Sequence, residues 1–518
     1  MSTPVSLSVD DLDQIFKRDD IRGLWPEILN SELAFLLGEA VYELLEARGL
    51  PLTLVLGHDA RKGSYALSLA LLRSFGMRGG KTTFLGLVSS EQLYYACGKY
   101  PERYAAGVMI TASHNPKEFN GMKFIHAGGS PFNSEDLACL KNSLRQKLNP
   151  PTVYPIGDEF AEYLLSQSEF SQKTSQRPLV KAVIDAGNGV GAVAFAPLAE
   201  RLKTMGYRIL FLNPEPDGDF PLGVPNPLMR TQIERLAKAV CRHRADLGII
   251  FDGDADRAGF VDSQGQEIIP SQVYALVARR KLAQHSIAHP VLMRNLCCSQ
   301  LLHTLFGQNP SELELVDTPV GHGQIKQLMR HPKYRDQVLF AGEHSGHYFY
   351  PEFFSVDSGF MTALLLLAEV RNLKSKKIGL PDILADWRKT YRWSGEINYI
   401  LPNQAVVLAT LRELEQQFGA LPGVCRQGIA LDQKLGLFRV FDLKNEYRPE
   451  TLDFPDLKII QQSPNAKSGW WFVVRPSGNE NKLRLNFESW NIPKAEAAQT
   501  MKNISAILNR QQAQKNTQ

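Results

Sequence analysis

One arrangement of strands recurs three times along the chain and limits its fold more than any other feature. Each unit has two short segments rich in valine, isoleucine and leucine, then a third that runs directly into a polar, glycine-containing loop, with helical patterns between them. The third segments and their loops read AAGVMITASHNP (105–116), ADLGIIFDGDADR (245–257) and QVLFAGEHSGH (337–347). Open α/β sheets bind ligands beyond the carboxyl ends of their strands. We therefore expect the loops to meet at one cleft, although an α/β chain can also carry such loops without a shared site.

The residues after about position 386 break this pattern. Mixed segments lead to a predicted hairpin, GWWFVVRPSGNENKLRLNFES (469–489), which indicates a smaller α+β domain. A chain of 518 residues is also too long for one hydrophobic core. We predict three α/β domains and one α+β domain, at residues 1–154, 155–265, 266–385 and 386–518.

Composition narrows the class of protein. No apolar run approaches the ~20 residues that span a bilayer, and the N-terminal residues lack a signal pattern, so we expect a cytoplasmic protein with no membrane partner. Basic and acidic side chains nearly balance, 58 against 54, which does not favour a nucleic-acid surface. The six cysteines show no C-x-x-C spacing, so we expect free, mostly buried thiols rather than disulfides or metal ligands.

The second of the three loops carries Asp252, Asp254 and Asp256 at alternating positions after an apolar strand. Three carboxylates this close repel one another unless a cation lies between them, and hard oxygen ligands suit Mg²⁺. A calcium EF-hand is excluded, because its sixth position is Arg257 instead of glycine and its twelfth is Ser263 instead of glutamate. A phosphatase with an aspartate nucleophile also places Asp-x-Asp after a strand, but the third aspartate and the missing threonine or valine argue against it. A solvated acidic turn is the remaining alternative.

Ser113 in the first loop has two functional interpretations. A hydrolase nucleophile would need a base held across the fold, whereas adjacent side chains such as Ser113 and His114 usually point apart, and no G-x-S-x-G elbow is present. A phosphate carrier would need a metal and cations, which the aspartate loop, Arg22, Lys123 and Arg257 can supply. The second interpretation uses more of the sequence.

Two glycine-containing loops are weaker signals. GNGVGA (187–192) fits G-x-G-x-x-A, so Gly187 and Gly189 could belong to an NAD site, but a tight turn between strand and helix is the favoured interpretation. GHDARKGS (57–64) lacks the spacing of a phosphate loop.

Two further loops suit a phosphorylated sugar. In RPSGNENK (475–482), Arg475 can pair with a phosphate, and the turn that follows offers hydroxyl and backbone N–H donors from Ser477, Gly478 and Asn479. In GEHSGH (342–347), Glu343, Ser345 and His347 can hydrogen-bond several vicinal hydroxyls. Taken alone, the first could be an ordinary hairpin turn, and the histidine could be structural.

Together these loops resemble the α-D-phosphohexomutase family, and more closely its bacterial phosphomannomutase/phosphoglucomutase branch. T-A-S-H-N-P, D-G-D-x-D-R, G-E-x-S-G-H and R-x-S-x-x-E occur in the family's order, and the resemblance runs from FKRDDIRG (16–23) to RLNFES (484–489). It implies an enzyme that interconverts hexose 6-phosphate and hexose 1-phosphate, of mannose or glucose, through a phosphoserine and a hexose 1,6-bisphosphate. The implied fold has three similar α/β domains with mixed sheets and a smaller fourth domain around a central cleft.

The resemblance also implies roles for individual residues. Ser113 is expected to carry the phosphoryl group and, with Asp252, Asp254 and Asp256, to bind Mg²⁺. The other implied catalytic residues are Arg22, His114, Lys123, Arg257 and His347. The implied substrate-binding residues are Glu343 and Ser345 for the sugar hydroxyls, and His322, Arg475, Ser477, Gly478 and Asn479 for the phosphate that is not transferred.

Some positions depart from the family's pattern. His58 and Asp19 stand where an arginine and an aromatic residue are frequent, and SGNEN (477–481) replaces the usual S-N-T-x-P or S-G-T-x-P. The alternatives are a sugar-phosphate phosphatase, an NAD dehydrogenase, a sugar-phosphate sensor, and a phosphoglucosamine mutase, whose branch usually has glutamine in place of His344. We expect small sugar phosphates as ligands, a monomer or homodimer, and a last domain that closes as a lid from a joint near residues 386–392.

Overall fold

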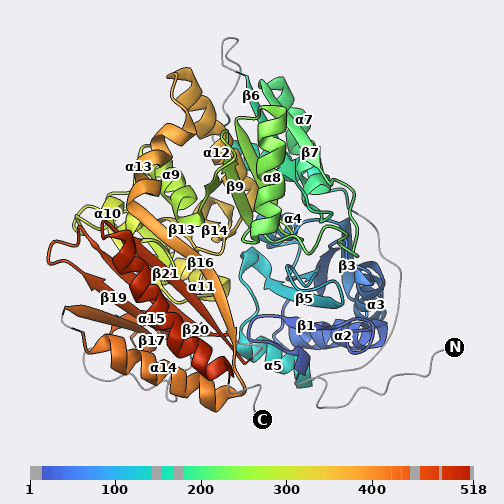
Figure 1. The fold of residues 1–518 in the computed structure, drawn as a ribbon. Coiled ribbons are helices and arrows are strands. Elements are labelled where there is room, and N and C mark those ends of the chain that lie inside the picture. Colours follow the sequence, from blue (N-terminus) through green and yellow to red (C-terminus); the bar gives the residue numbers. More distant parts are fainter. Residues whose placement is uncertain are drawn as a thin grey trace. The chain divides into compact units, whose positions relative to one another are not determined.

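The computed structural model describes residues 14–142, 154–168, 170, 179–421, 423–432, 434–443, 455–477 and 481–513. It contains two compact units, which are described separately below. Figure 1 labels their helices and strands. Unit 1 comprises Met1–Gln284 and Ser345–Pro381, and unit 2 comprises His285–His344 and Asp382–Gln518. No helix among the described residues has the length and apolar character needed to cross a bilayer.

The first sheet of unit 1 has the strand order β1-β5-β4-β2-β3. Strands β4, β2 and β3 are parallel, and β5 runs antiparallel between β4 and β1. The helices α2 and α3 share a core with the sheet, in which Leu37, Leu71, Leu56 and Val108 are fully buried. The elements are β1 (Ile21–Leu24), α2 (Ser31–Ala47), β2 (Thr53–His58), α3 (Ser64–Met77), β3 (Lys81–Leu87), α4 (Ser90–Lys99), β4 (Ala106–Ile110), β5 (Phe119–His126) and α5 (Ser134–Asn142).

The second sheet of unit 1 repeats this plan in the order β10-β9-β8-β6-β7. Helix α8 packs on β8 and β9 (Figure 1). Its apolar face includes Leu236 and Val240. In both sheets the third parallel strand lies between the first parallel strand and an antiparallel strand, so a single loop reverses the chain at its carboxyl end. The elements are α6 (Gly157–Gln167), β6 (Val180–Asp185), α7 (Gly191–Thr204), β7 (Tyr207–Leu212), α8 (Arg230–His243), β8 (Leu247–Phe251), β9 (Ala258–Asp262), β10 (Glu267–Ile268) and α9 (Pro270–Leu282).

Residues 345–381 complete unit 1. The short strands β14 (Tyr348–Tyr350) and β15 (Val356–Asp357) pair antiparallel, and the long helix α12 (Gly359–Ser375) follows them. Phe360 at the start of α12 packs edge-on against Phe251 at the end of β8, with ring centroids 4.9 Å apart. This contact fixes the beginning of α12 beside the loop that follows β8.

Unit 2 contains a third set of parallel strands, with β11 between β12 and β13. Its elements are β11 (Val291–Asn295), α10 (Gln300–Phe306), β12 (Glu314–Thr318), α11 (His322–Arg330) and β13 (Val338–Gly342). The three segments predicted for this repeat therefore correspond to β11, β12 and β13. The order of the parallel strands, third-first-second, is the same as in the two sheets of unit 1.

The remainder of unit 2 is an antiparallel sheet in the order β16-β21-β20-β19-β17-β18. Helices α14 and α15 share a core with it, in which Leu411, Ile504 and Phe472 are fully buried. The predicted hairpin is confirmed as β20 and β21. The elements are α13 (Leu380–Thr390), β16 (Tyr391–Ile400), α14 (Gln404–Gly419), β17 (Val424–Asp432), β18 (Leu437–Asp442), β19 (Leu457–Gln462), β20 (Gly469–Pro476), β21 (Lys482–Trp490) and α15 (Lys494–Ala513).

Two buried charges join this antiparallel sheet to the loop after β11. Glu488 of β21 accepts hydrogen bonds from the backbone N–H of Gln300 and from Trp471 Nε1, both at 2.8 Å. Lys458 of β19 donates to the carbonyl of Leu296 at 2.7 Å. Because buried charges need such partners, these contacts hold the C-terminal residues and residues 285–344 together in one unit.

The predicted fold class is confirmed by this architecture, while the predicted domain boundaries stay a prediction. The cysteines are free, as expected. The expectation that they are mostly buried is wrong, because Cys139 and Cys241 are exposed and Cys425 is partly exposed. The spacing of cysteines in the sequence carries no information on their exposure.

Candidate functional site

Ser113 lies in the loop between β4 and β5 and is almost fully buried, with 3% of its surface exposed. Its backbone is left-handed, with φ at 53°, and its N–H donates to Thr111 Oγ1 at 2.8 Å. Its hydroxyl donates to Asp252 Oδ2 at 3.3 Å. A Cβ added to Gly253 would lie 2.8 Å from the Ser113 carbonyl oxygen. A glycine is therefore required for the two loops to approach this closely.

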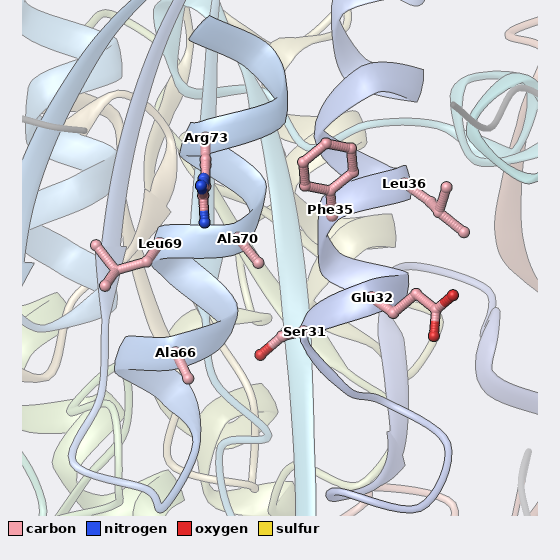
Figure 2. A pocket seen from close by; sticks show the side chains of 8 residues that line it. All are labelled: Ser31, Glu32, Phe35, Leu36, Ala66, Leu69, Ala70 and Arg73. Carbon is pink, nitrogen blue, oxygen red and sulfur yellow. The ribbon is translucent and has the colours of Figure 1, made fainter. Parts of the chain in front are cut away.

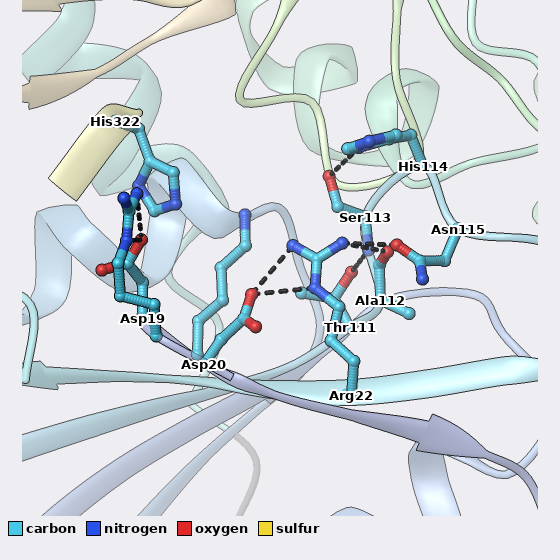
Figure 3. A network of polar contacts seen from close by, with 12 residues as sticks. Asp19, Asp20, Arg22, Thr111, Ala112, Ser113, His114, Asn115 and His322 are labelled. Carbon is cyan, nitrogen blue, oxygen red and sulfur yellow. Dashed lines mark hydrogen bonds and ion pairs between the residues drawn. The ribbon is translucent and has the colours of Figure 1, made fainter. Parts of the chain in front are cut away.

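His114 does not point away from Ser113, so the expectation that these neighbours diverge is wrong. Its Nδ1 lies 3.4 Å from Ser113 Oγ (Figure 3). The left-handed turn at Ser113 bends the chain and brings consecutive side chains to one side. The charge of Arg257, burial and the charge of Arg22 together hold the pKa of His114 well below its ordinary value. This ring is therefore neutral near pH 7 and resists protonation.

Arg22 on β1 lies across the serine loop. Its guanidinium is paired with Asp20 at 2.8 Å and donates to the carbonyl of Ala112 at 3.1 Å and to Asn115 Oδ1 at 2.5 Å (Figure 3). Strand β1 pairs with β5, which places Arg22 opposite Gly121. Asp20 and Asn115 were not predicted as site residues. The run of charges in FKRDDIRG was the available signal for Asp20.

The loop between β8 and β9 brings the three predicted metal ligands together. Asp252, Asp254 and Asp256 are all buried, and each offers a carboxylate oxygen within 4.8 Å of the other two. Lys123 donates to Asp254 at 2.7 Å and to Asp256 at 2.6 Å, and Arg257 Nε donates to Asp252 at 2.8 Å. Opposite charges thus surround a compact carboxylate cluster.

This cluster fits a divalent cation. Asp254 Oδ1 and Asp256 Oδ1 are buried without a hydrogen-bond partner, which leaves acceptor capacity that a hard cation can use. Burial raises the pKa of Asp252 above its ordinary value. Burial acts the same way on Asp256, but the charges of Lys123, His347 and Arg257 outweigh it and hold the pKa of Asp256 well below that value. Asp256 is therefore ionised near pH 7, and a bound cation would also favour the ionised form of Asp252.

The second half of the predicted sugar loop lies beside the carboxylates, within unit 1. Ser345 Oγ and His347 Nδ1 are 2.8 Å apart, and His347 Nε2 is 3.6 Å from Asp256 Oδ1. Arg257 and His347 also form an isolated β-bridge. Unit 1 therefore brings together Ser113, His114, Arg22, Lys123, Arg257, His347 and the three aspartates.

The other predicted substrate residues belong to unit 2. Glu343 Oε1 accepts hydrogen bonds from Asn295 Nδ2 at 3.0 Å and from the N–H of Gly321 at 2.9 Å. His322 begins α11, and its Nδ1 lies 3.4 Å from Lys326 Nζ. Asn295 was missed, because a polar residue at the end of a buried strand has no recognisable spacing.

The predicted phosphate turn is partly described. Arg475 near the end of β20 pairs with Glu396 at 3.1 Å, and Arg484 on β21 pairs with the same carboxylate at 3.2 Å. Ser477 donates its N–H to the carbonyl of Lys482 at 2.8 Å. Gly478 and Asn479 lie outside the described residues. The two arginines form a cross-strand pair, so the sheet concentrates positive charge at this end of the hairpin.

The GNGVGA loop is a tight turn, the favoured interpretation of its glycines. It connects β6 to α7, and a Cβ at Gly189 would lie 2.9 Å from the carbonyl oxygen of Gly253. The N–H of Val190 donates to the same carbonyl at 3.2 Å. This turn therefore packs against the aspartate loop at Gly253 and stabilises it.

A cavity of about 590 Å³ lies between α2 and α3 (Figure 2). Its lining is mainly apolar and includes Phe35, Leu36 and Leu69, with Glu32 and Arg73 at its edges. None of the predicted site residues lines it, so it is separate from the carboxylate cluster.

Burial of His344 predicts a loss of stability in acid. Burial lowers its pKa to about 3, and its ring packs edge-on against Trp393 with centroids 4.2 Å apart. The unfolded chain binds a proton here below about pH 6.5 whereas the folded chain does not, so stability falls as the pH drops from 7 to 5. For this one group the loss at pH 5 is about 2 kcal/mol.

The variant His344→Gln is therefore expected to lose about 2 kcal/mol less stability than the wild type over this interval. Urea titrations at pH 7 and pH 5 measure the difference. His289→Gln, at an exposed histidine of the same unit, should follow the wild type. An equal pH dependence in His344→Gln and wild type would contradict the prediction.

Four segments match successive parts of one family, described as phosphoglucomutase/phosphomannomutase. They are the alpha/beta/alpha domains I, II and III, at residues 13–150, 158–265 and 270–390, and the C-terminal domain at residues 459–506. The chain belongs to this family.

Named relatives agree with this assignment. A phosphomannomutase from Salmonella montevideo is 32% identical over 511 residues, which cover 95% of this chain and 98% of the relative. A phosphomannomutase from Escherichia coli is 32% identical over 487 residues, which cover 92% and 94%. Membership makes this chain an enzyme of the mutase type, in the isomerase class.

Solved structures show the same fold. A family protein from Burkholderia thailandensis has a TM-score of 0.72 at 23% identity and covers 97% of this chain and 98% of its own. A phosphoglucomutase from Paramecium, called parafusin, has a TM-score of 0.73 at 17% identity, with coverage of 98% and 96%. A more distant N-acetylphosphoglucosamine mutase from Aspergillus fumigatus, at 12% identity, a TM-score of 0.52 and coverage of 98% and 100%, was solved with glucose 1,6-bisphosphate.

Proposed function

We propose that this phosphohexomutase interconverts hexose 6-phosphate and hexose 1-phosphate, with mannose or glucose as the sugar, through a phosphorylated Ser113. One observation carries the proposal. The Ser113 hydroxyl lies 3.3 Å from Asp252 in a buried carboxylate cluster, and Arg22, Lys123 and Arg257 are in the same unit. A serine in this setting suits a phosphate carrier better than a hydrolytic nucleophile.

In the proposed reaction phospho-Ser113 gives its phosphoryl group to the free hydroxyl of a bound hexose monophosphate. The bond between phosphorus and Ser113 Oγ breaks, a bond to the sugar oxygen forms, and the sugar hydroxyl loses its proton. The product is a hexose 1,6-bisphosphate, which turns over in the site. The other phosphate then returns to Ser113, and the proton returns to the sugar oxygen that this phosphate leaves. Catalysis rests on positioning and electrostatic stabilisation.

Asp252, Asp254 and Asp256 would hold Mg²⁺, with an oxygen of phospho-Ser113 as a further ligand. The cation would supply positive charge to the phosphoryl group as it transfers. Lys123 donates to two of these carboxylates, and Arg257 donates to the third. These contacts support a role for both residues in keeping the carboxylates ionised and ordered.

The proton of the sugar hydroxyl needs an acceptor near Ser113. His347 is the proposed acceptor. Lys123 is proposed to return a proton, because burial is outweighed by the charges of Asp254 and Asp256, which hold its pKa well above the ordinary value. His114 also lies beside the serine oxygen, but its lowered pKa makes it a weak acceptor. His347 is hydrogen-bonded to Ser345 at 2.8 Å, which fixes its ring. A ring held in one orientation suits general acid–base catalysis.

The substrate's sugar and its second phosphate would bind to residues of the remaining loops. Glu343 and Ser345 are proposed to hold two sugar hydroxyls, and Asn295 supports the Glu343 carboxylate. His322, Arg475, Ser477, Gly478 and Asn479 are proposed to bind the phosphate that is not transferred. The planar guanidinium of Arg475 suits a phosphate, because its N–H groups can donate in pairs.

Two other functions use the same residues. A sugar-phosphate phosphatase would let water accept the phosphoryl group, and a phosphoglucosamine mutase would take an amino sugar. The named relatives favour mannose or glucose phosphates over these alternatives.

A coupled assay tests the proposal. Mannose 1-phosphate, glucose 1-phosphate and glucosamine 1-phosphate are supplied separately with Mg²⁺ and a catalytic amount of glucose 1,6-bisphosphate. We expect formation of the 6-phosphate from the mannose or glucose substrate, with little inorganic phosphate. Release of inorganic phosphate in proportion to turnover would instead identify a phosphatase, and turnover of glucosamine 1-phosphate alone would identify the amino sugar as substrate.

A further inference from the structure

Arg61 follows β2, in the GHDARKGS loop, and its side chain is entirely buried. Its Nη2 donates to the carbonyls of Ser113 at 2.7 Å and Asn115 at 2.6 Å. Its Nη1 donates to the carbonyls of Pro116 at 2.8 Å and Phe119 at 3.0 Å. One guanidinium therefore donates hydrogen bonds to four backbone carbonyls of the loop that contains Ser113.

Asp59 connects this guanidinium to the other side of the same loop. Its Oδ2 lies 3.3 Å from Arg61 Nε and accepts a hydrogen bond from Thr111 Oγ1 at 2.8 Å. Thr111 Oγ1 in turn accepts the N–H of Ser113 at 2.8 Å. Both the N–H and the C=O of Ser113 are thus fixed by one connected group of buried side chains. The Phe220 ring lies 5.1 Å from the guanidinium, from a separate segment of the chain.

The backbone conformation of Ser113 explains why these hydrogen bonds matter for the position of its hydroxyl. A serine at a φ of 53° lies in a region that residues with a side chain seldom adopt. Such a conformation persists only where the surrounding contacts enforce it. Without them, the loop is expected to relax and move the Ser113 hydroxyl away from Asp252.

We propose that Arg61 is a positioning residue, which holds the serine loop so that the Ser113 oxygen faces the carboxylate cluster. The inference rests on the proposed phosphoserine function and extends it to a residue that contacts Ser113 at its backbone carbonyl and belongs to no proposed sugar contact. Lysine cannot replace Arg61, because its three N–H donors radiate from one nitrogen, whereas the two terminal nitrogens of the guanidinium reach four carbonyls.

The test compares Arg61→Lys with the wild type. This variant keeps a positive charge for Asp59, so folding is expected to survive. We expect kcat to fall about 100-fold, because small misplacements of a reacting group cost this much. The KM for the hexose phosphate should change less than about twofold, since Arg61 belongs to no proposed sugar or phosphate contact. Phosphorylation of Ser113 by glucose 1,6-bisphosphate, followed by mass spectrometry, should slow by the same factor as kcat.

Two further variants complete the experiment. Lys62→Gln changes the next residue, which is exposed and pairs with Asp219 at the surface, and should match the wild type. Thr111→Val removes the hydroxyl between Asp59 and Ser113 without leaving a buried charge unpaired, and should lower kcat about tenfold with KM unchanged. If Arg61→Lys does not fold, Thr111→Val decides the question.

The outcomes separate the two proposals. Wild-type protein that is not phosphorylated on Ser113 would contradict the proposed function itself. Wild-type protein that is phosphorylated, alongside an Arg61→Lys variant with normal kcat or with a change in KM alone, would overturn the role of Arg61. Normal kcat in Thr111→Val would overturn it in the same way.

Discussion

Ser113→Ala is expected to lower mutase turnover by at least about 10⁴-fold while the protein stays folded. The substitution removes the oxygen that would carry the phosphoryl group, and nothing else at that position can form the phosphate ester. Alanine is not expected to strain the loop further, because it tolerates the left-handed backbone about as well as serine does. The coupled assay measures turnover, and a thermal unfolding curve shows whether the fold is retained.

Ser130→Ala provides the matched control. Ser130 lies in the same domain after β5 and is not a predicted site residue. Its turnover should equal that of the wild type. Wild-type turnover in Ser113→Ala would contradict the phosphoserine mechanism, because this variant has no oxygen at position 113 to carry the phosphoryl group.

Removal of the cation is expected to have the second largest effect. A chelator should reduce turnover by at least about 10³-fold, since a metal ion supplies several kcal/mol of charge stabilisation in phosphoryl transfer. Added Mg²⁺ should restore it. Asp254→Asn should show a similar loss that excess Mg²⁺ does not restore, because the amide cannot supply the negative charge of a ligand whose Oδ1 is buried without a hydrogen-bond partner.

Asp246→Asn is the control for this substitution. Asp246 belongs to the same domain but pairs with Lys374 in an exposed contact. Its variant should keep wild-type turnover and wild-type Mg²⁺ dependence. Full turnover of the wild type in chelator, with bound metal excluded by elemental analysis, would show that the carboxylates have another role.

The sequence predicted the strands and loops well because the signals are local. Apolar segments of five to seven residues correspond to β2, β6, β8 and β11, and the polar residues that follow them mark the loops. The aspartate cluster could also be predicted from the sequence, because alternating carboxylates after a buried strand seldom have a purely structural role. The hairpin of β20 and β21 followed from its turn residues.

Other features depend on backbone geometry or on distant partners. The side chain of His114 approaches Ser113 only because of the left-handed turn, and no residue pattern in the sequence predicts this turn. The role of Arg61 cannot be predicted from GHDARKGS, because its four partners are backbone carbonyls that the sequence does not distinguish.

The extent of the predicted lid also depends on contacts between residues that are distant in the sequence. The joint near residues 386–392 was inferred from a change in sequence pattern. Glu488 and Lys458 nevertheless hold the C-terminal sheet to the loop at residues 296–300, through contacts more than 150 residues apart in sequence. The predicted lid would therefore include residues 285–344, which belong to the same compact unit. The lid itself stays a prediction.

Transfer of a phosphoryl group through Ser113 can be measured directly. The wild type is incubated with glucose 1,6-bisphosphate and Mg²⁺, freed of small molecules, and mapped by peptide mass spectrometry; hexose 6-phosphate is then added in a rapid-quench experiment. We predict one phosphoryl group on Ser113, which passes to the sugar at least as fast as steady-state turnover. A phosphoryl group on another residue, or one on Ser113 that leaves more slowly than turnover, would contradict a phosphoserine intermediate.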